Sequence, residues 1–408
     1  VEYAIGVAGV AGAEPFAGPR TRGYPMPPLR RSGWNELTDH GARALGWHPY
    51  PTPAALNSRP YDGRAACTYC GYCSGSGCHV DAKGSPDVTL IPTAEATGLL
   101  EVRTGARVTR IEVDPLRSDR VTGVRYVLDG QERRATGRIV VLSTFTYENV
   151  RLLLLSASEH HPQGLANNAG QVGAHFVPHV TPSVSGLFPG RRLNLFTGTW
   201  GQSTVVDDWN GDNFDHAGLG FIGGGALMAA NEVRPIAAST LTPPSVPRWG
   251  SAWKAWLAAN APSVGSAVAQ FESLSYVHNR LDLDPTAVDA HGIPRIRITY
   301  QPGENEYRGA AFLRERLREW LRAAGAQEVW ADEEIHIEGR HVYGGTRIGD
   351  DPRTSALDAF GFAHEVGNLA VLGGSTFVSS GGHNPTLTAQ ALAWRTSEEM
   401  LRRLRAPD

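Results

Sequence analysis

Residues 381–388 of the chain read Gly381-Gly382-His383-Asn384-Pro385-Thr386-Leu387-Thr388. A Gly/Ser loop precedes them, and before that loop Leu369 to Gly374 is an apolar run that predicts a buried strand. Thr386 to Arg403 is predicted to form the last helix. The order is therefore a strand, a Gly/Ser loop, a polar tip and a helix N-terminus, where free N–H groups can face an electron-rich partner.

The composition of the whole chain limits which classes of protein it can belong to. The chain has 408 residues, 41% hydrophobic and 19% charged, which is ordinary for a globular protein of two domains or one large one. A net charge of −3 gives no electrostatic basis for binding nucleic acid. No apolar run approaches the roughly 20 residues that span a bilayer. The chain opens on the largely apolar run at Val1 without a signal peptide, so we expect a processed or truncated N-terminus and leave periplasmic and cytoplasmic locations open.

Changes in composition and pattern along the chain predict four segments, namely 1–66, 67–174, 175–330 and 331–408. The first is rich in Pro, Gly and Arg and predicts a loop-rich extension. The second has period-two runs and one helical run, which predict strands and a helix at Leu100–Arg103, Arg107–Val113, Val121–Leu128, Arg138–Leu142 and Tyr147–Ser156, with a hairpin turn at Asp129-Gly130. The third predicts a mostly antiparallel domain, with β-like runs at Phe214–Gly225 and Ile293–Tyr300 and an amphipathic helix at Glu304–Ala324 that Gly325 ends.

All four cysteines fall in one short window, as Cys67-x2-Cys70-x2-Cys73-x4-Cys78. Thiolates two residues apart can surround one metal centre, and this run resembles bacterial iron–sulfur ligation. Zinc sites usually separate two such pairs by a longer loop, and disulfides at this spacing are strained. We favour an iron–sulfur cluster and keep zinc, local disulfides and free thiols as alternatives.

Two glycine-rich strings resemble phosphate-binding loops. Gly218 to Gly223 spells G-x-G-x-x-G, but a polar run precedes it and no clear helix follows, so its context does not fit a nucleotide site. Gly6, Gly9 and Gly12 have the wrong spacing for such a loop. Neither string is therefore predicted to be a dinucleotide-binding fingerprint.

Several motifs together resemble the glucose–methanol–choline (GMC) oxidoreductase superfamily. They are Asn57 to Gly63 before the cysteine window, Gly164 to Asn167, Gly170 to Gly173, His341 and the run from Asn384 to Thr388. The resemblance covers nearly the whole chain. It is closest to the branch that holds the flavoprotein subunits of gluconate, glucose and fructose dehydrogenases, glucoside 3-dehydrogenases and pyranose oxidases.

The resemblance implies an α/β FAD-binding domain and an α+β substrate domain built on an antiparallel sheet. It also implies that the family's FAD fingerprint lies before residue 1, on a segment that is cleaved, separate or omitted. By position, His341 and Asn384 match the catalytic pair, and the cysteine window matches the place of an iron–sulfur cluster. The implied FAD contacts are Val108, Gly374, Ser375, Asn384 and Thr386.

The function implied by this resemblance is FAD-dependent oxidation of a sugar or glycoside hydroxyl to a carbonyl. His341 would act as general base and Asn384 would hold the substrate oxygen, while His383 is interpreted as a loop residue. Electrons would pass to an iron–sulfur cluster or an external acceptor. The expected partners are the substrate, a chain or segment that supplies the FAD fingerprint, a small subunit and an electron acceptor. The alternatives are an oxygen-using sugar oxidase and a metal-binding fragment or subunit without catalysis.

Overall fold

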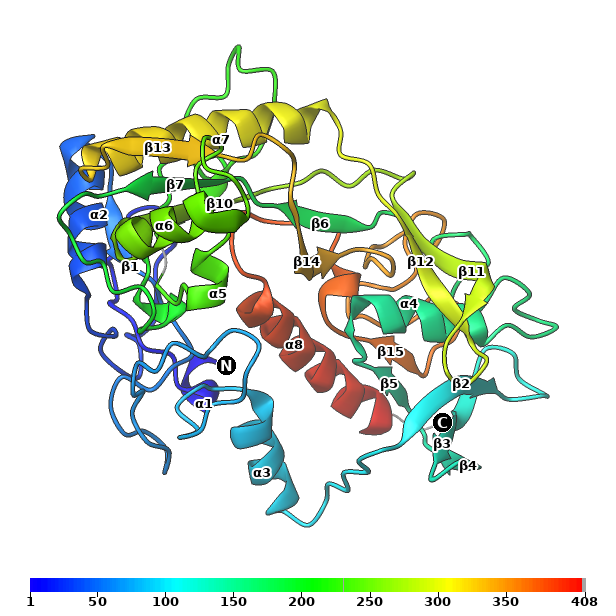
Figure 1. Ribbon diagram of the computed structural model, residues 1–408. Coiled ribbons are helices and arrows are strands. Elements are labelled where there is room, and N and C mark those ends of the chain that lie inside the picture. Colours follow the sequence, from blue (N-terminus) through cyan, green and yellow to red (C-terminus); the bar gives the residue numbers. More distant parts are fainter. Residues whose placement is uncertain (230, 406–408) are drawn as a thin grey trace. The chain divides into compact units, whose positions relative to one another are not determined.

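The computed structural model of the protein describes residues 1–229 and 231–405 (Figure 1). These residues form two compact units, and each unit consists of three separate segments of the chain. Unit 1 consists of Val1–Glu101, Val180–Glu272 and Glu304–His336. Unit 2 consists of Val102–His179, Ser273–Gly303 and the chain from Ile337 onward. The four segments expected from the sequence remain a prediction.

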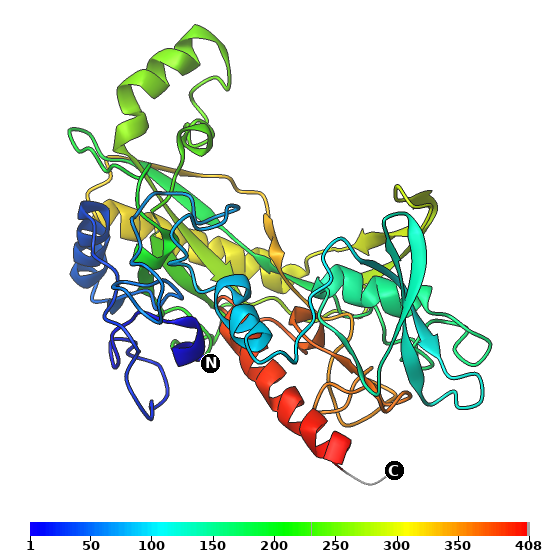
Figure 2. The same ribbon diagram turned by 90° about the horizontal axis from the view of Figure 1, so that it is seen from below.

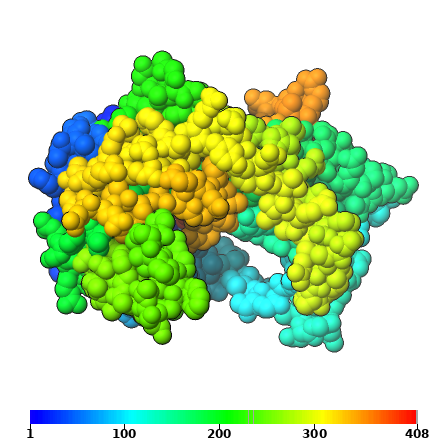
Figure 3. Space-filling model, turned by 45° about the horizontal axis from the view of Figure 1, so that its top comes forward, coloured from blue at the N-terminus to red at the C-terminus, as the bar shows by residue number. Residues whose placement is uncertain are grey.

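Unit 1 is built on an antiparallel sheet, as the sequence predicts for the second domain. Its neighbouring strands are, in order, β1 (Pro49–Pro51), β8 (Thr204–Val206), β9 (Gly225–Ala229), β10 (Val264–Phe271), β7 (Ser183–Leu187) and β13 (Glu328–Ala331). The helix α7 (Glu304–Ala323) packs along β10 and β7 and buries Leu313, Leu317 and Trp320 (Figure 1). In Figure 3 the opposite side of α7 (yellow) forms part of the surface of this unit.

The predicted loop-rich extension contains a helix that the sequence reading missed. It is α2 (Gly33–Ala44), which packs against α7 and begins at a capping box between Ser32 and Asn35. The other helices of unit 1 are short or exposed, namely α1 (Glu2–Ile5), α3 (Leu90–Glu95), α5 (Pro235–Ala238) and α6 (Gly250–Asn260), with 3-10 turns η1 (Pro86–Val88), η2 (Trp200–Gln202) and η3 (Ala261–Ser263). Figure 2 shows α6 (green) standing away from the sheet of this unit.

Unit 2 combines small antiparallel sheets with one parallel pair of strands. Antiparallel pairing joins β2 (Arg107–Val113), β3 (Val121–Leu128) and β4 (Gln131–Thr136), and separately β11 (Arg280–Val288) and β12 (Pro294–Thr299). Parallel pairing joins β5 (Val140–Leu142) to β15 (Leu369–Val371). The strand β14 (Ile337–Tyr343) lies beside β6 (Val177–Val180). The helices are α4 (Phe145–Leu155) and α8 (Thr386–Arg405), with the 3-10 turn η4 (Gly374–Thr376) between β15 and α8.

Two strand predictions and one strand pairing are wrong. Leu100–Arg103 forms no strand, because the segment is exposed and pairs with no other strand among the described residues. The hairpin turn at Asp129-Gly130 is correct, but it leads to the polar, exposed β4. The predicted strand Arg138–Leu142 does contain β5, which pairs with β15 instead. Phe214–Gly225 consists of turns, and the strand begins only at its last residue. Exposed strands such as β4 carry no alternation of apolar residues, so period two cannot reveal them.

Candidate functional site

The structure brings the predicted pair His341 and Asn384 together in unit 2. His341 lies on β14, and Asn384 lies two residues before the first turn of α8. Nε2 of His341 is 3.4 Å from Nδ2 of Asn384, although 43 positions separate the two residues. His341 is half-buried and Asn384 is exposed, so a small molecule can reach both polar groups.

A second histidine lies behind His341, and the sequence reading did not single it out. His179 comes from β6 and is fully buried. Its Nδ1 lies 3.2 Å from Nδ1 of His341, and the two rings meet edge to face at 84°. Its other ring nitrogen, Nε2, lies 2.6 Å from the carbonyl oxygen of Gly381 and 3.0 Å from the hydroxyl of Tyr343. The Gly381 carbonyl and the Tyr343 hydroxyl, the two histidines and Asn384 form one hydrogen-bonded chain of five groups.

Local structure holds this chain of groups in place. His341 and Tyr343 are two residues apart on β14 and therefore project to the same face of the strand. The ring of Tyr343 stacks on Phe377, which lies in the loop between η4 and α8. Farther along that loop, the Ser380 hydroxyl accepts the N–H of Ser273 at 2.7 Å. The carbonyl of Gly381 is thereby fixed against His179.

Burial controls the charge of both histidines. It lowers the pKa of His341, against the opposing effect of the Glu338 carboxylate. Burial, reinforced by the neighbouring His341, lowers the pKa of His179 to about 4. The Glu338 carboxyl has its own pKa lowered to about 2, chiefly by its hydrogen bonds from the Arg340 guanidinium at 2.8 and 2.7 Å. Both imidazoles are therefore neutral near pH 7, and a neutral His341 can accept a proton.

The predicted flavin-side residues Gly374 and Ser375 lie in the turn that follows β15. Ligands of α/β proteins bind beyond the carboxyl ends of parallel strands, and β15 and β5 are such a pair. The turn is tied to the segment that follows β14, the strand of His341, because the Thr346 N–H donates to the Ser375 carbonyl at 3.0 Å. The Asn149 amide of α4 also donates to the Ser375 hydroxyl, at 2.9 Å.

These surroundings fit the reactive end of FAD. The Thr346 hydroxyl is buried beside the turn and has no hydrogen-bond partner among the described residues. A bound group with a polar edge would satisfy it. Gly374 lies so close to β14 that a Cβ there would be 2.5 Å from the Val342 carbonyl oxygen, which keeps the turn against the strand that carries His341. Thr386, at the start of α8, is exposed near Asn384.

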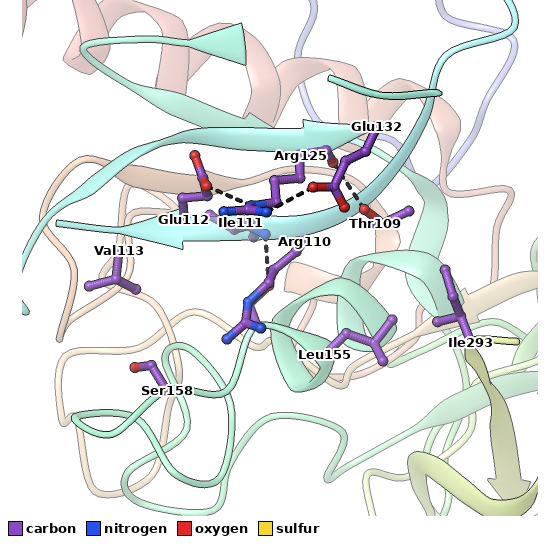
Figure 4. A pocket seen from close by; sticks show the side chains of 11 residues that line it. Thr109, Arg110, Ile111, Glu112, Val113, Arg125, Glu132, Leu155, Ser158 and Ile293 are labelled. Atoms are coloured by element: carbon purple, nitrogen blue, oxygen red, sulfur yellow. Dashed lines mark hydrogen bonds and ion pairs between the residues drawn. The ribbon is translucent and has the colours of Figure 1, made fainter. Parts of the chain in front are cut away.

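Val108 is placed apart from this group of residues. It lies on β2, in the three-stranded sheet, where it pairs with Tyr126. Its implied contact with FAD stays a prediction. The groove that begins one residue later on the same strand has a volume of about 550 Å³ and contains none of the catalytic candidates. Figure 4 shows Arg125 in this groove between the carboxylates of Glu112 and Glu132, at 2.7 and 2.8 Å. Arg134 also pairs with Glu112, so two cations compensate the two carboxylates.

The four cysteines lie in one loop of unit 1 as half-buried free thiols. Burial raises the pKa of the Cys67 and Cys73 thiols. Burial opposes ionisation of Cys78 as well, yet the N–H groups of Val80, Lys83 and Ala82 outweigh it and lower the pKa of that thiol. Across residues 1–229 and 231–405, no three His, Cys, Asp or Glu side chains are grouped so that they could hold a metal ion. The donor chemistry suits iron–sulfur ligation, but this arrangement of the sulfurs does not fit a cluster.

Three residues of the site were missed at the level of sequence. They are His179, Tyr343 and Glu338. For His179, the available signal was a histidine within the run Val177–Val180, which is buried, because buried polar groups need partners. Tyr343 could have been found as the same-face neighbour of His341. His383 is an exposed loop residue, as interpreted.

Comparison with known proteins identifies the region that holds the catalytic candidates. Residues 275–393 match the family described as GMC oxidoreductase, and this range includes both His341 and Asn384. In the described part of the chain, no helix is long and apolar enough to cross a membrane.

Individual relatives extend the likeness to nearly the full chain. The gluconate 2-dehydrogenase flavoprotein of Pantoea cypripedii is 33% identical over 93% of this chain, which spans 64% of that relative's length. The fructose dehydrogenase large subunit of Gluconobacter japonicus is 29% identical over 99% of this chain and 72% of its own. Pyridoxine 4-oxidase from Mesorbium loti has a similar fold, with a TM-score of 0.58 at 15% identity over 93% of this chain and 72% of its own.

Proposed function

Because the chain belongs to the GMC oxidoreductases, we propose that it carries the catalytic residues of an FAD-dependent oxidation of an alcohol to a carbonyl compound. We further propose a sugar or glycoside hydroxyl as the substrate. The names of the gluconate and fructose dehydrogenases support this substrate class. The observation that carries the proposal is the approach of His341 Nε2 to Asn384 Nδ2 beside the end of β14.

The geometry of the pair suits proton abstraction from a hydroxyl group. Two atoms 3.4 Å apart leave room for one oxygen at hydrogen-bond distance from both. Asn384 donates its amide N–H to that oxygen, and Nε2 of His341 takes the hydroxyl proton. The chemistry that FAD supplies when bound is acceptance of the hydride from the same carbon. Gly374, Ser375 and Thr346 are the residues that would hold its reactive end.

The next point is where the electrons would go after FAD. We propose an external acceptor for the electrons, because the cysteine sulfurs are not grouped so that they could hold a metal ion. Iron analysis of the purified protein tests whether Cys67, Cys70, Cys73 and Cys78 bind a cluster. The name of the fructose dehydrogenase large subunit supports a partner chain for this protein too.

An absorption spectrum, recorded before and after adding gluconate, glucose, fructose or a methyl glycoside without oxygen, tests the proposal. Flavin bands that bleach with one of these substrates are the expected result. The matched control is His341→Gln, which should keep the flavin bands and lose the bleaching. Rapid return of the bands on admission of air would identify an oxidase. Flavin bands that none of these alcohols bleaches would refute the substrate class.

A further inference from the structure

We infer that His179 is a positioning residue that holds the proton of His341 on Nδ1, and thereby leaves Nε2 of His341 unprotonated toward Asn384. The inference rests on the proposed function only for its catalytic consequence. The proton arrangement follows from hydrogen-bond chemistry alone. A neutral imidazole has one N–H and one bare nitrogen, so each hydrogen bond along the chain fixes the next.

The chain of donors starts at Gly381. A carbonyl oxygen can only accept, and that of Gly381 lies 2.6 Å from Nε2 of His179. Nε2 of His179 must therefore carry the hydrogen. The Tyr343 hydroxyl lies 3.0 Å from the same nitrogen. Its oxygen can also accept from this N–H, so the contact is compatible with a hydrogen on Nε2 of His179.

The next step depends on the charge of His179. The ring is fully buried, and His341, Glu338 and His383 are the ionisable groups whose charges act on it. Burial disfavours the imidazolium form and lowers the pKa of His179 far below neutrality, against the weaker opposing effect of Glu338. A neutral His179 with hydrogen on Nε2 has a bare Nδ1, which can only accept.

His341 then has one arrangement left. Its Nδ1 lies 3.2 Å from the bare Nδ1 of His179, so this nitrogen of His341 must be the donor. Its Nε2 is consequently bare and faces the Asn384 amide at 3.4 Å. When Nε2 takes a substrate proton, the Nδ1–H bond to His179 stays in place. The proton gained on Nε2 is the only change in the chain, so no compensating transfer to His179 is needed.

The opposite tautomer of His341 would oppose catalysis. With hydrogen on Nε2, two bare Nδ1 atoms would face each other at 3.2 Å, and two N–H donors would face each other at Asn384. A base in that state has no lone pair toward the substrate. The buried acceptor on His179 therefore selects the productive form, in the way that a buried partner orients catalytic histidines generally.

The direct test is the 15N spectrum of the full chain labelled on its histidine rings. The signals of His341 are identified as those missing from His341→Gln. We expect the pair of shifts of a histidine protonated on Nδ1. A His341 protonated on Nε2 in the wild-type protein would overturn the inference, whatever the enzyme does.

Variants of His179 test the causal step. His179→Leu removes the acceptor and should give His341 shifts averaged over both tautomers, with kcat lowered by roughly 10–100-fold and KM nearly unchanged. His179→Asn places a carbonyl oxygen near the same position and should restore part of the Nδ1–H signature and of kcat. His161→Leu is the matched control, because it removes another buried histidine of unit 2, whose Nε2 lies 2.8 Å from the Ser118 carbonyl oxygen. It should change neither the tautomer of His341 nor kcat by more than about twofold.

These readouts separate the two proposals. A wild-type Nδ1–H signature that is lost in His179→Leu, in a protein that oxidises no sugar, would support the role of His179 and refute the proposed substrate class. Retention of the signature in His179→Leu would overturn the role of His179, whether or not sugar is oxidised. If His179→Leu does not fold, the wild-type spectrum and the Asn variant still decide the question.

Discussion

Substitution of Gly374 by alanine tests the coupling between the η4 turn and β14, the strand that bears the proposed base His341. The new Cβ would lie 2.5 Å from the carbonyl oxygen of Val342, the residue after His341. An ordinary carbon–oxygen contact is about 3.3 Å, so the turn must move from β14 by roughly 0.8 Å. A displacement near 1 Å in a catalytic site costs on the order of 100-fold, and overpacking costs about 1–3 kcal/mol of stability.

We therefore expect Gly374→Ala to lower kcat for sugar oxidation by about 10–100-fold and to lower the thermal midpoint. Gly367→Ala is the matched control on the same segment, because its Cβ would meet no heavy atom within 4 Å. Steady-state kinetics and thermal unfolding of both variants are compared at equal flavin content. Rates and midpoints of Gly374→Ala equal to those of the control would refute the reasoning.

Three further predictions concern the base, its charge and the core. His341→Gln should lower kcat by about 10²–10⁴-fold in steady-state assays because the general base is lost, and near-wild-type turnover would contradict this. Glu338→Gln removes the carboxylate that opposes the lowering of the His341 pKa by burial, so the acid limb of kcat/KM against pH should move to lower pH; a shift to higher pH would argue against this field. Gly309→Ala puts a Cβ 2.1 Å from the Phe271 ring and should lower the free energy of unfolding, measured by denaturant titration, by about 1–3 kcal/mol. An increase in that free energy, from the higher helix propensity of alanine, would show that the ring moves aside.

Local patterns predicted the elements that bury one face against neighbouring elements, because that burial gives their apolar residues a clear period along the sequence. The helices α4, α7 and α8 lie within a few residues of their predicted ranges, and so do β2 and β3. The helix α2 was hidden in a Gly- and Pro-rich segment, although Ser32 and Asn35 form its capping box. The strand β4 was hidden because both of its faces are largely exposed, so no apolar alternation marks it.

The cysteine window shows a different limit of sequence reasoning. Spacing alone shows that four thiols can approach one another, and the structure does place them in one half-buried loop. Whether three sulfurs converge depends on the backbone of that loop and on its neighbours, such as the Thr199 hydroxyl that donates to Cys73 at 3.3 Å. Ligand spacing is therefore a weaker guide to a metal centre than to a common loop.

The amino-acid sequence by itself determined the resemblance to the GMC oxidoreductases, the prediction of His341 and Asn384 as a catalytic pair, and the strand–loop–helix order around Asn384. These depend on residue types and on short-range order along the chain, which are present before folding. Only the tertiary structure decided that His179 meets His341 across 162 positions and that β5 lies parallel to β15. The physical reason is that a hydrogen bond depends on distance and direction in space, and buried strands with similar apolar runs do not specify their neighbours until they pack.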